Sequence, residues 1–145
     1  MFNLFKNKEK SVPKEDEFFC KVACLLIHAA KIDEIYSDEE KEIIKKTLIE
    51  LGAKASNISK LISDATIIEN NSNQILDFTR EIKNMSKTDK NKIIESLWKI
   101  IYSNENADIY ETNLMRRLAG LLYVDASTMG NLKEKIKKKL IKWLI

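Results

Sequence analysis

The chain has 145 residues, of which 44% are hydrophobic and 32% charged, and its three glycines and one proline leave few positions that would break a helix. This composition indicates one soluble all-α domain that is long enough to bury a core. The net charge of +3 is uneven, with +2 on residues 1–13, +5 on residues 131–145 and −4 between them, and an acidic body with basic ends disfavours a nucleic-acid binder, whose basic residues gather on one face.

Residues 1–13 are expected to form a flexible basic tail, in which Phe2, Leu4 and Phe5 precede three lysines. They lack the basic segment and long apolar run of a secretory signal, and no apolar segment of the chain is long enough to span a bilayer. We therefore expect a cytoplasmic protein with reduced cysteines and a single helical domain over residues 14–145.

Apolar residues recur at steps of three and four in seven segments, which is the pattern of amphipathic helices. The first predicted helix covers residues 14–31. The second begins at a capping box, in which Ser37 is followed three residues later by Glu40, and ends at Gly52. No segment alternates with a period of two, so no sheet is expected. Five further helices are predicted at about residues 57–69, 72–85, 89–103, 109–123 and 127–145.

The sequence repeats itself at an offset of 71 residues. Two acidic turns, residues 33–40 and 104–111, align at this offset, and the flanking apolar positions align as well, for example Leu26 with Leu97 and Leu61 with Leu132. This alignment predicts two pseudo-repeated three-helix units joined by a central helix. Because one such unit buries little apolar surface, we expect the two units to share a core and to place their acidic turns in comparable positions.

Oxygen-bearing side chains recur at the same steps in both acidic turns. Such a set can place three oxygens on one side of a loop that runs into a helix, which suits Ca²⁺ or Mg²⁺. Helix capping and the helix dipole favour the same residue types, so the pattern fits either role. The EF-hand spacing is absent. The candidate metal ligands are Asp33, Ser37 and Glu40 in the first turn and Asn104, Asp108 and Glu111 in the second.

Each acidic turn lies between apolar helices, and the second is followed by Leu-Met-Arg-Arg-Leu-Ala-Gly-Leu-Leu-Tyr-Val at residues 114–124. Apart from three positions, both turns follow the form Asp-Gly-x-x-(Asp/Ser)-x-x-Glu. In these features the chain resembles the TerB-like family of tellurite-resistance proteins, over roughly residues 18–140. The resemblance implies an all-helical fold and a role in metal-linked stress response, with no defined reaction, and its acidic set falls on the candidate ligands. Glu34 and Glu105 replace the family's glycine and Asn104 replaces its first aspartate, which makes the first turn the better candidate for an ion.

Cys20, Cys24 and His28 fall on one side of the first predicted helix, and soft metals such as zinc bind these groups. Structural zinc takes four ligands, however, and the chain has no other cysteine or histidine, so buried thiols are the favoured interpretation. No nucleophile with a catalytic sequence signature accompanies His28. We therefore expect that the protein is not an enzyme.

Residues 131–145 hold six lysines beside an apolar stripe that ends in Trp143, Leu144 and Ile145. This pattern is compatible with an anionic membrane surface. The alternative is a packed last helix with its lysines in water. Packing is favoured for residues 131–140, because Leu132 and Ile136 match core positions of the first unit, and residues 141–145 fit either interpretation.

The leading hypothesis is a non-enzymatic, cytoplasmic TerB-like domain that acts in stress response as an interaction or divalent-cation-sensing module through its acidic turns, with a protein as partner. The first alternative is a peripheral adaptor at the inner membrane face that uses both basic ends. The second is a metal-assisted hydrolase that uses paired carboxylates from the two turns.

Overall fold

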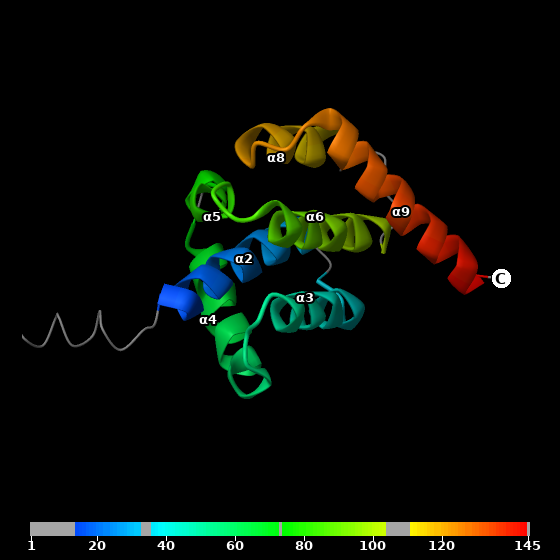
Figure 1. Ribbon diagram of the computed structural model, residues 1–145. Helices are drawn as coiled ribbons and strands as arrows, with labels where there is room; N and C mark the ends of the chain where they lie inside the picture. Colours follow the sequence, from blue (N-terminus) through cyan, green and yellow to red (C-terminus); the bar gives the residue numbers. More distant parts are fainter. Residues whose placement is uncertain (1–13, 33–35, 73, 104–110, 145) are drawn as a thin grey trace, which may run out of the picture.

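The computed structural model describes residues 14–32, 36–72, 74–103 and 111–144 of the chain. These residues form seven α-helices and no strand, which confirms the all-α prediction for the described part of the chain (Figure 1). A 3-10 turn, Ala55–Asn57, precedes α4, and a π-helical turn, Glu111–Met115, precedes α8. The helices are α2 (Lys14–Ala30), α3 (Asp38–Glu50), α4 (Ile58–Asn70), α5 (Leu76–Ile82), α6 (Lys87–Tyr102), α8 (Arg116–Leu121) and α9 (Ala126–Leu144).

Two helices differ from their predicted extents. α5 covers 76–82 instead of 72–85, because Ser72 forms a turn in which its hydroxyl lies 3.3 Å from Asp77 Oδ2 and accepts from the Gln74 N–H at 3.5 Å. Ser86 caps the following helix by accepting from the Asp89 N–H at 3.2 Å. The sixth predicted helix, 109–123, contains α8 at 116–121 after the π-helical turn. A wider turn of this kind is not visible in a pattern based on 3.6 residues per turn.

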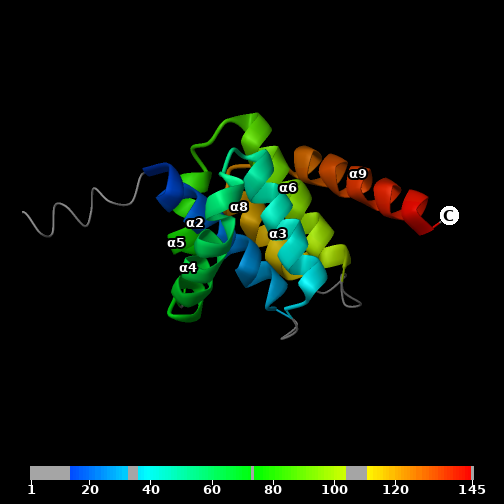
Figure 2. The same ribbon diagram turned by 90° about the horizontal axis from the view of Figure 1, so that it is seen from below.

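The helix α2 is the centre of the fold. It packs against α3, α4, α5 and α6, and the six consecutive residues 22–27 are all 0% exposed. A helical segment whose residues are buried on all sides belongs to the interior of a bundle. α4 packs on α2, while α9 packs on α6, and Figures 1 and 2 show α4 and α9 on opposite sides of the molecule.

Positions paired by the 71-residue offset are buried in both halves of the chain. Leu26 and Leu97 are both 0% exposed, and Ala65 and Ile136 are 0% and 1% exposed. The contact of α2 with α4 corresponds to that of α6 with α9. Buried positions and helix contacts thus correspond in the two halves, and the apolar stripes of both contribute to one core. The repeat itself stays a prediction.

The ends of α3 and α8 also correspond at this offset. Gly52 and Tyr123 both have positive φ, +111° and +57°. Ala53 N–H donates to Leu48 O at 2.9 Å after α3, and Val124 N–H donates to Ala119 O at 2.9 Å after α8. This is the hydrogen-bond pattern of a Schellman C-cap, in which the residue with positive φ is usually glycine. The same hydrogen-bond pattern thus closes both helices, although only the first has glycine at the position with positive φ.

Replacing Gly52 by alanine should destabilise the protein by about 1–2 kcal/mol, because an L side chain rarely adopts a φ of +111°. Gly130 is the matched control, since it lies inside α9 with nothing within 4 Å of an added Cβ, and Gly130→Ala should instead stabilise by about 0.5–1 kcal/mol. Urea denaturation of the two variants measures both effects. Equal effects of the same sign would contradict the assignment of the C-cap.

Candidate functional site

The described part of the first acidic turn is a complete capping box at the start of α3. Glu40 N–H donates to Ser37 Oγ at 3.1 Å, and Ser37 N–H donates to Glu40 Oε1 at 2.9 Å. The Ser37 hydroxyl lies 3.0 Å from the same carboxylate oxygen, and Glu40 is only 2% exposed. Two of the six candidate metal ligands therefore satisfy the backbone groups that a helix start leaves open.

Lysines of α3 offset part of the negative charge at this turn. Lys41 Nζ lies 3.7 Å from Asp38 Oδ1 and 5.2 Å from the centre of the Tyr36 ring, and Lys45 Nζ lies 3.4 Å from Glu42 Oε1. Burial, with the Glu40 carboxylate nearby, raises the pKa of Tyr36 to about 12. The turn therefore combines a buried, hydrogen-bonded carboxylate with solvent-exposed acidic groups at its rim.

The other candidate ligands cannot be placed against this turn. Asp33, Asn104 and Asp108 lie outside the described residues, and so does the side chain of Glu111, whose backbone begins the π-helical turn. Among the residues described, no group of three histidine, cysteine, aspartate or glutamate side chains is placed to hold a metal ion. Convergence of the two turns stays a prediction.

Cys24 and His28 lie on the same side of α2, as their spacing predicts, and this side faces α4. The Cys24 thiol donates to Ala65 O at 3.5 Å, and His28 Nδ1 lies 3.3 Å from Glu69 Oε1. Glu69 also accepts from Lys31 Nζ at 2.6 Å through its other oxygen. A hydrogen bond between the two thiols lowers the pKa of Cys20 and raises that of Cys24. The favoured interpretation of small thiols packed in the core agrees with this geometry.

Glu69 is a residue that the sequence patterns missed. It is 8% exposed and joins α4 to His28 and Lys31 on α2. A signal was present, since Glu69 follows Ala65 by four residues on the buried stripe of α4, where a carboxylate requires a partner. The sequence could indicate that Glu69 needs a partner, but it could not identify residues 38 and 41 positions earlier in the chain.

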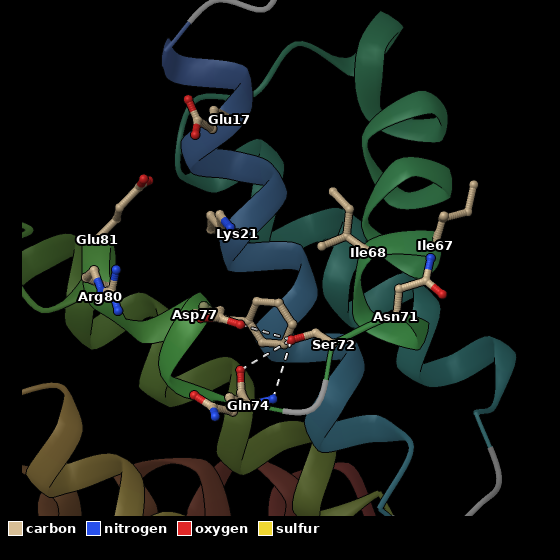
Figure 3. A pocket seen from close by; sticks show the side chains of 11 residues that line it. Glu17, Lys21, Ile67, Ile68, Asn71, Ser72, Gln74, Asp77, Arg80 and Glu81 are labelled. Carbon is tan, nitrogen blue, oxygen red and sulfur yellow. Dashed lines mark hydrogen bonds between the residues drawn. The ribbon is translucent and has the colours of Figure 1, made fainter.

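An open pocket of about 760 Å³ lies between the first turns of α2, the end of α4 and α5 (Figure 3). In Figure 3 the isoleucines of α4 lie on one side, Arg80 and Glu81 of α5 on the other, and Glu17 and Lys21 of α2 between them. The pocket is lined by Glu17, Lys21, Ile67, Ile68, Asn71, Ser72, Gln74, Asp77, Phe78, Arg80 and Glu81.

The lining of this pocket combines apolar side chains with charges of both signs. Ile67 is 59% exposed and Ile68 39%, whereas Phe78 is 2% exposed. Within the described parts of the chain, Glu17, Lys21, Arg80 and Glu81 form no ion pair shorter than 4 Å. The pocket can therefore receive an apolar side chain of a ligand against the isoleucines, while a charged group of the same ligand pairs with one of these four residues. The sequence patterns did not predict this pocket. A signal was present, since Ile67 is an apolar residue that lies off the buried stripe of α4, on its polar face.

The last helix contacts α6 through several of its lysines as well as through buried apolar side chains. Lys133 Nζ lies 5.9 Å from the centre of the Trp98 ring, Lys137 Nζ lies 5.6 Å from that of Tyr102, and Lys135 Nζ lies 2.7 Å from Glu95 Oε1. Leu132 and Ile136 are buried, in agreement with the packing expected for residues 131–140. None of the helices in the described ranges is both long enough and apolar enough to cross a membrane.

Comparison with models of protein families gives a match over most of the chain. The family model described as Tellurite resistance protein TerB matches residues 20–134. No curated protein and no solved structure matches the chain. The matched range begins in α2 and ends in α9, so it includes both halves of the fold.

Proposed function

Because the chain belongs to the family of the tellurite resistance protein TerB, we propose that it is a non-enzymatic interaction module of a stress response, and that a protein partner binds in the pocket between α2, α4 and α5. The observation that carries this proposal is the exposure of two adjacent isoleucines beside an open pocket. Its volume lies within the range of about 300–1,000 Å³ that is common for ligand sites.

Two physical features of the pocket support a protein partner. Covering an exposed isoleucine removes apolar area from water, which is worth about 1.5–3 kcal/mol for a fully buried side chain. Glu17, Lys21, Arg80 and Glu81 line the rest of the pocket with charges that can select an orientation. Protein interfaces commonly combine apolar area with polar and charged groups in this way.

Replacing both isoleucines by serine should abolish the binding of the partner. Both chains are used as bait in cells under metal stress. We expect the Ile67→Ser, Ile68→Ser variant to capture at least tenfold less of a protein that the unmodified chain captures. Ile49→Ser is the matched control, because Ile49 is 48% exposed and lies on α3, which does not line the pocket. Equal retention of every captured protein by all three baits would reject the pocket as the interface.

Sensing of a divalent cation at the first acidic turn is the second candidate function. The observation that favours it is the position of Asp38 and Glu39, both exposed, beside the buried carboxylate of Glu40. Capping accounts for Glu40 and Ser37 but needs neither of the exposed carboxylates. Ca²⁺ and Mg²⁺ are the ions expected from an all-oxygen set, and Asp33 would be the further ligand.

Calorimetric titration with Ca²⁺ and Mg²⁺ tests this second candidate. The variant Asp33→Asn, Glu40→Gln should lose the heat of binding, since both changes remove a charge while glutamine at position 40 preserves the capping box. Asp64→Asn is the control, because Asp64 is an exposed aspartate of α4. Absence of heat for the unmodified protein at millimolar ion would reject cation sensing.

A further inference from the structure

We propose that the chain's own N-terminal segment, residues 1–13, docks in the pocket between α2, α4 and α5 and competes there with a partner. The docking itself is argued from the pocket and the sequence, whereas its regulatory meaning rests on the function proposed above for this pocket. Phe2, Leu4 and Phe5 are the apolar anchors of the segment, and the lysines that follow them are its charged part.

The pocket offers what such a segment needs. Ile67 and Ile68 present apolar area to solvent at one side, and the carboxylates of Glu17 and Glu81 lie across the pocket from them (Figure 3). Neither carboxylate forms an ion pair with another described residue. The cations Lys21 and Arg80 line the pocket as well, but Asp77 brings the carboxylates to three against two cations. A ligand with apolar side chains next to lysines therefore suits both the apolar area and the excess of negative charge.

The N-terminal segment has apolar residues first and lysines after them. Its first five residues include Phe2, Leu4 and Phe5, and Lys6, Lys8 and Lys10 follow at alternate positions. Aromatic side chains bury much apolar area at a low cost in conformational entropy, so they are effective anchors. Lysines beside them would face Glu17 and Glu81 when an anchor lies against the isoleucines.

The connection to α2 places the segment within reach of the pocket. α2 begins at Lys14, and Glu17, one turn later, already lines the pocket. The nine residue steps from Phe5 to Lys14 span at most about 30 Å when extended. A short tether of this kind gives an effective concentration in the millimolar range, so a contact with a Kd of about 1 mM would be formed about half of the time.

Methyl NMR of the full chain tests the docking without any partner. We expect the variant Phe2→Ser, Leu4→Ser, Phe5→Ser to shift the δ1 methyl signals of Ile67 and Ile68, because the ring currents of the two phenylalanines are lost. The Ile49 methyl should stay in place and serves as the internal control. Adding a synthetic peptide of residues 1–12 to this variant should return the two signals toward their positions in the unmodified chain, and Ile67→Ser, Ile68→Ser should weaken the binding of that peptide.

Two outcomes would overturn the proposal. The first is that the Ile67 and Ile68 methyl signals coincide in the unmodified chain and the serine variant. The second is that the difference between them disappears on dilution, since this would mean that a second copy supplies the segment. Because no partner is present, either outcome leaves the capture experiment on the pocket as an independent test of the proposed function.

Discussion

Replacing Leu97 by alanine should lower the free energy of unfolding by about 2.7–5 kcal/mol, which is the range for a leucine deleted from a closely packed core. Leu97 is 0% exposed and lies on α6, which packs against α2, α3 and α9. The loss has two parts: the apolar transfer energy of the removed atoms, and the energy of the cavity that remains because the packed helices relax only partly. Urea denaturation measures the change from the shift of the midpoint at constant slope.

Leu26 provides the companion measurement, because it occupies the position of Leu97 in the other half of the chain and is also 0% exposed. Leu26→Ala should cost an amount in the same range. Ile49→Ala, at a side chain that is 48% exposed, should change the stability by only about 0.5 kcal/mol. If one of the two leucine variants behaved like the Ile49 control, the two halves would not share one core.

Replacing Trp98 by alanine should cost about 3–5 kcal/mol and loosen α9. The indole is 3% exposed, stacks on Tyr102 with ring centres 5.9 Å apart and lies under the ammonium group of Lys133. Its removal takes away both the apolar area and the aromatic surface that holds a lysine of α9. Hydrogen exchange of α9 amides, followed together with urea denaturation, separates the loss of stability from the release of the helix.

Trp98→Phe is the matched control for this prediction. Phenylalanine keeps an aromatic ring at the joint of α6 and α9, and the buried indole N–H has no hydrogen-bond partner among the described residues, so no such bond is lost. This variant should therefore be distinctly more stable than Trp98→Ala.

Co-sedimentation of the unmodified chain with anionic vesicles tests the alternative of a membrane adaptor, which an absence of binding at low salt would reject.

Much of the fold could be predicted because its determinants are local. The capping box of Ser37 and Glu40 consists of groups three residues apart, and its hydrogen bonds are the predicted ones. Gly52 ends α3 because it adopts a positive φ, as its place after an apolar stripe indicates. The start of α8 was harder to predict, since a π-helical turn changes the number of residues per turn without a signal in the spacing.

The candidate site could be predicted only in its local part. The sequence identified Ser37 and Glu40 and explained them as a cap, whereas their role toward a cation depends on residues outside the described ranges and stays a prediction. It did not identify the pocket, because Glu17, Ile67 and Glu81 come from three helices whose mutual placement is set by packing angles.

The sequence by itself determined the helices, their caps and the apolar faces that form one core. These features depend on periodicity and on groups within a few residues of one another, so they can be inferred without knowing the packing. Only the tertiary structure placed Glu69 against His28, the lysines of α9 against the aromatic rings of α6, and two isoleucines beside an open pocket. Such contacts join side chains far apart in the chain, and they form only once the burial of the apolar faces has set the angles between the helices.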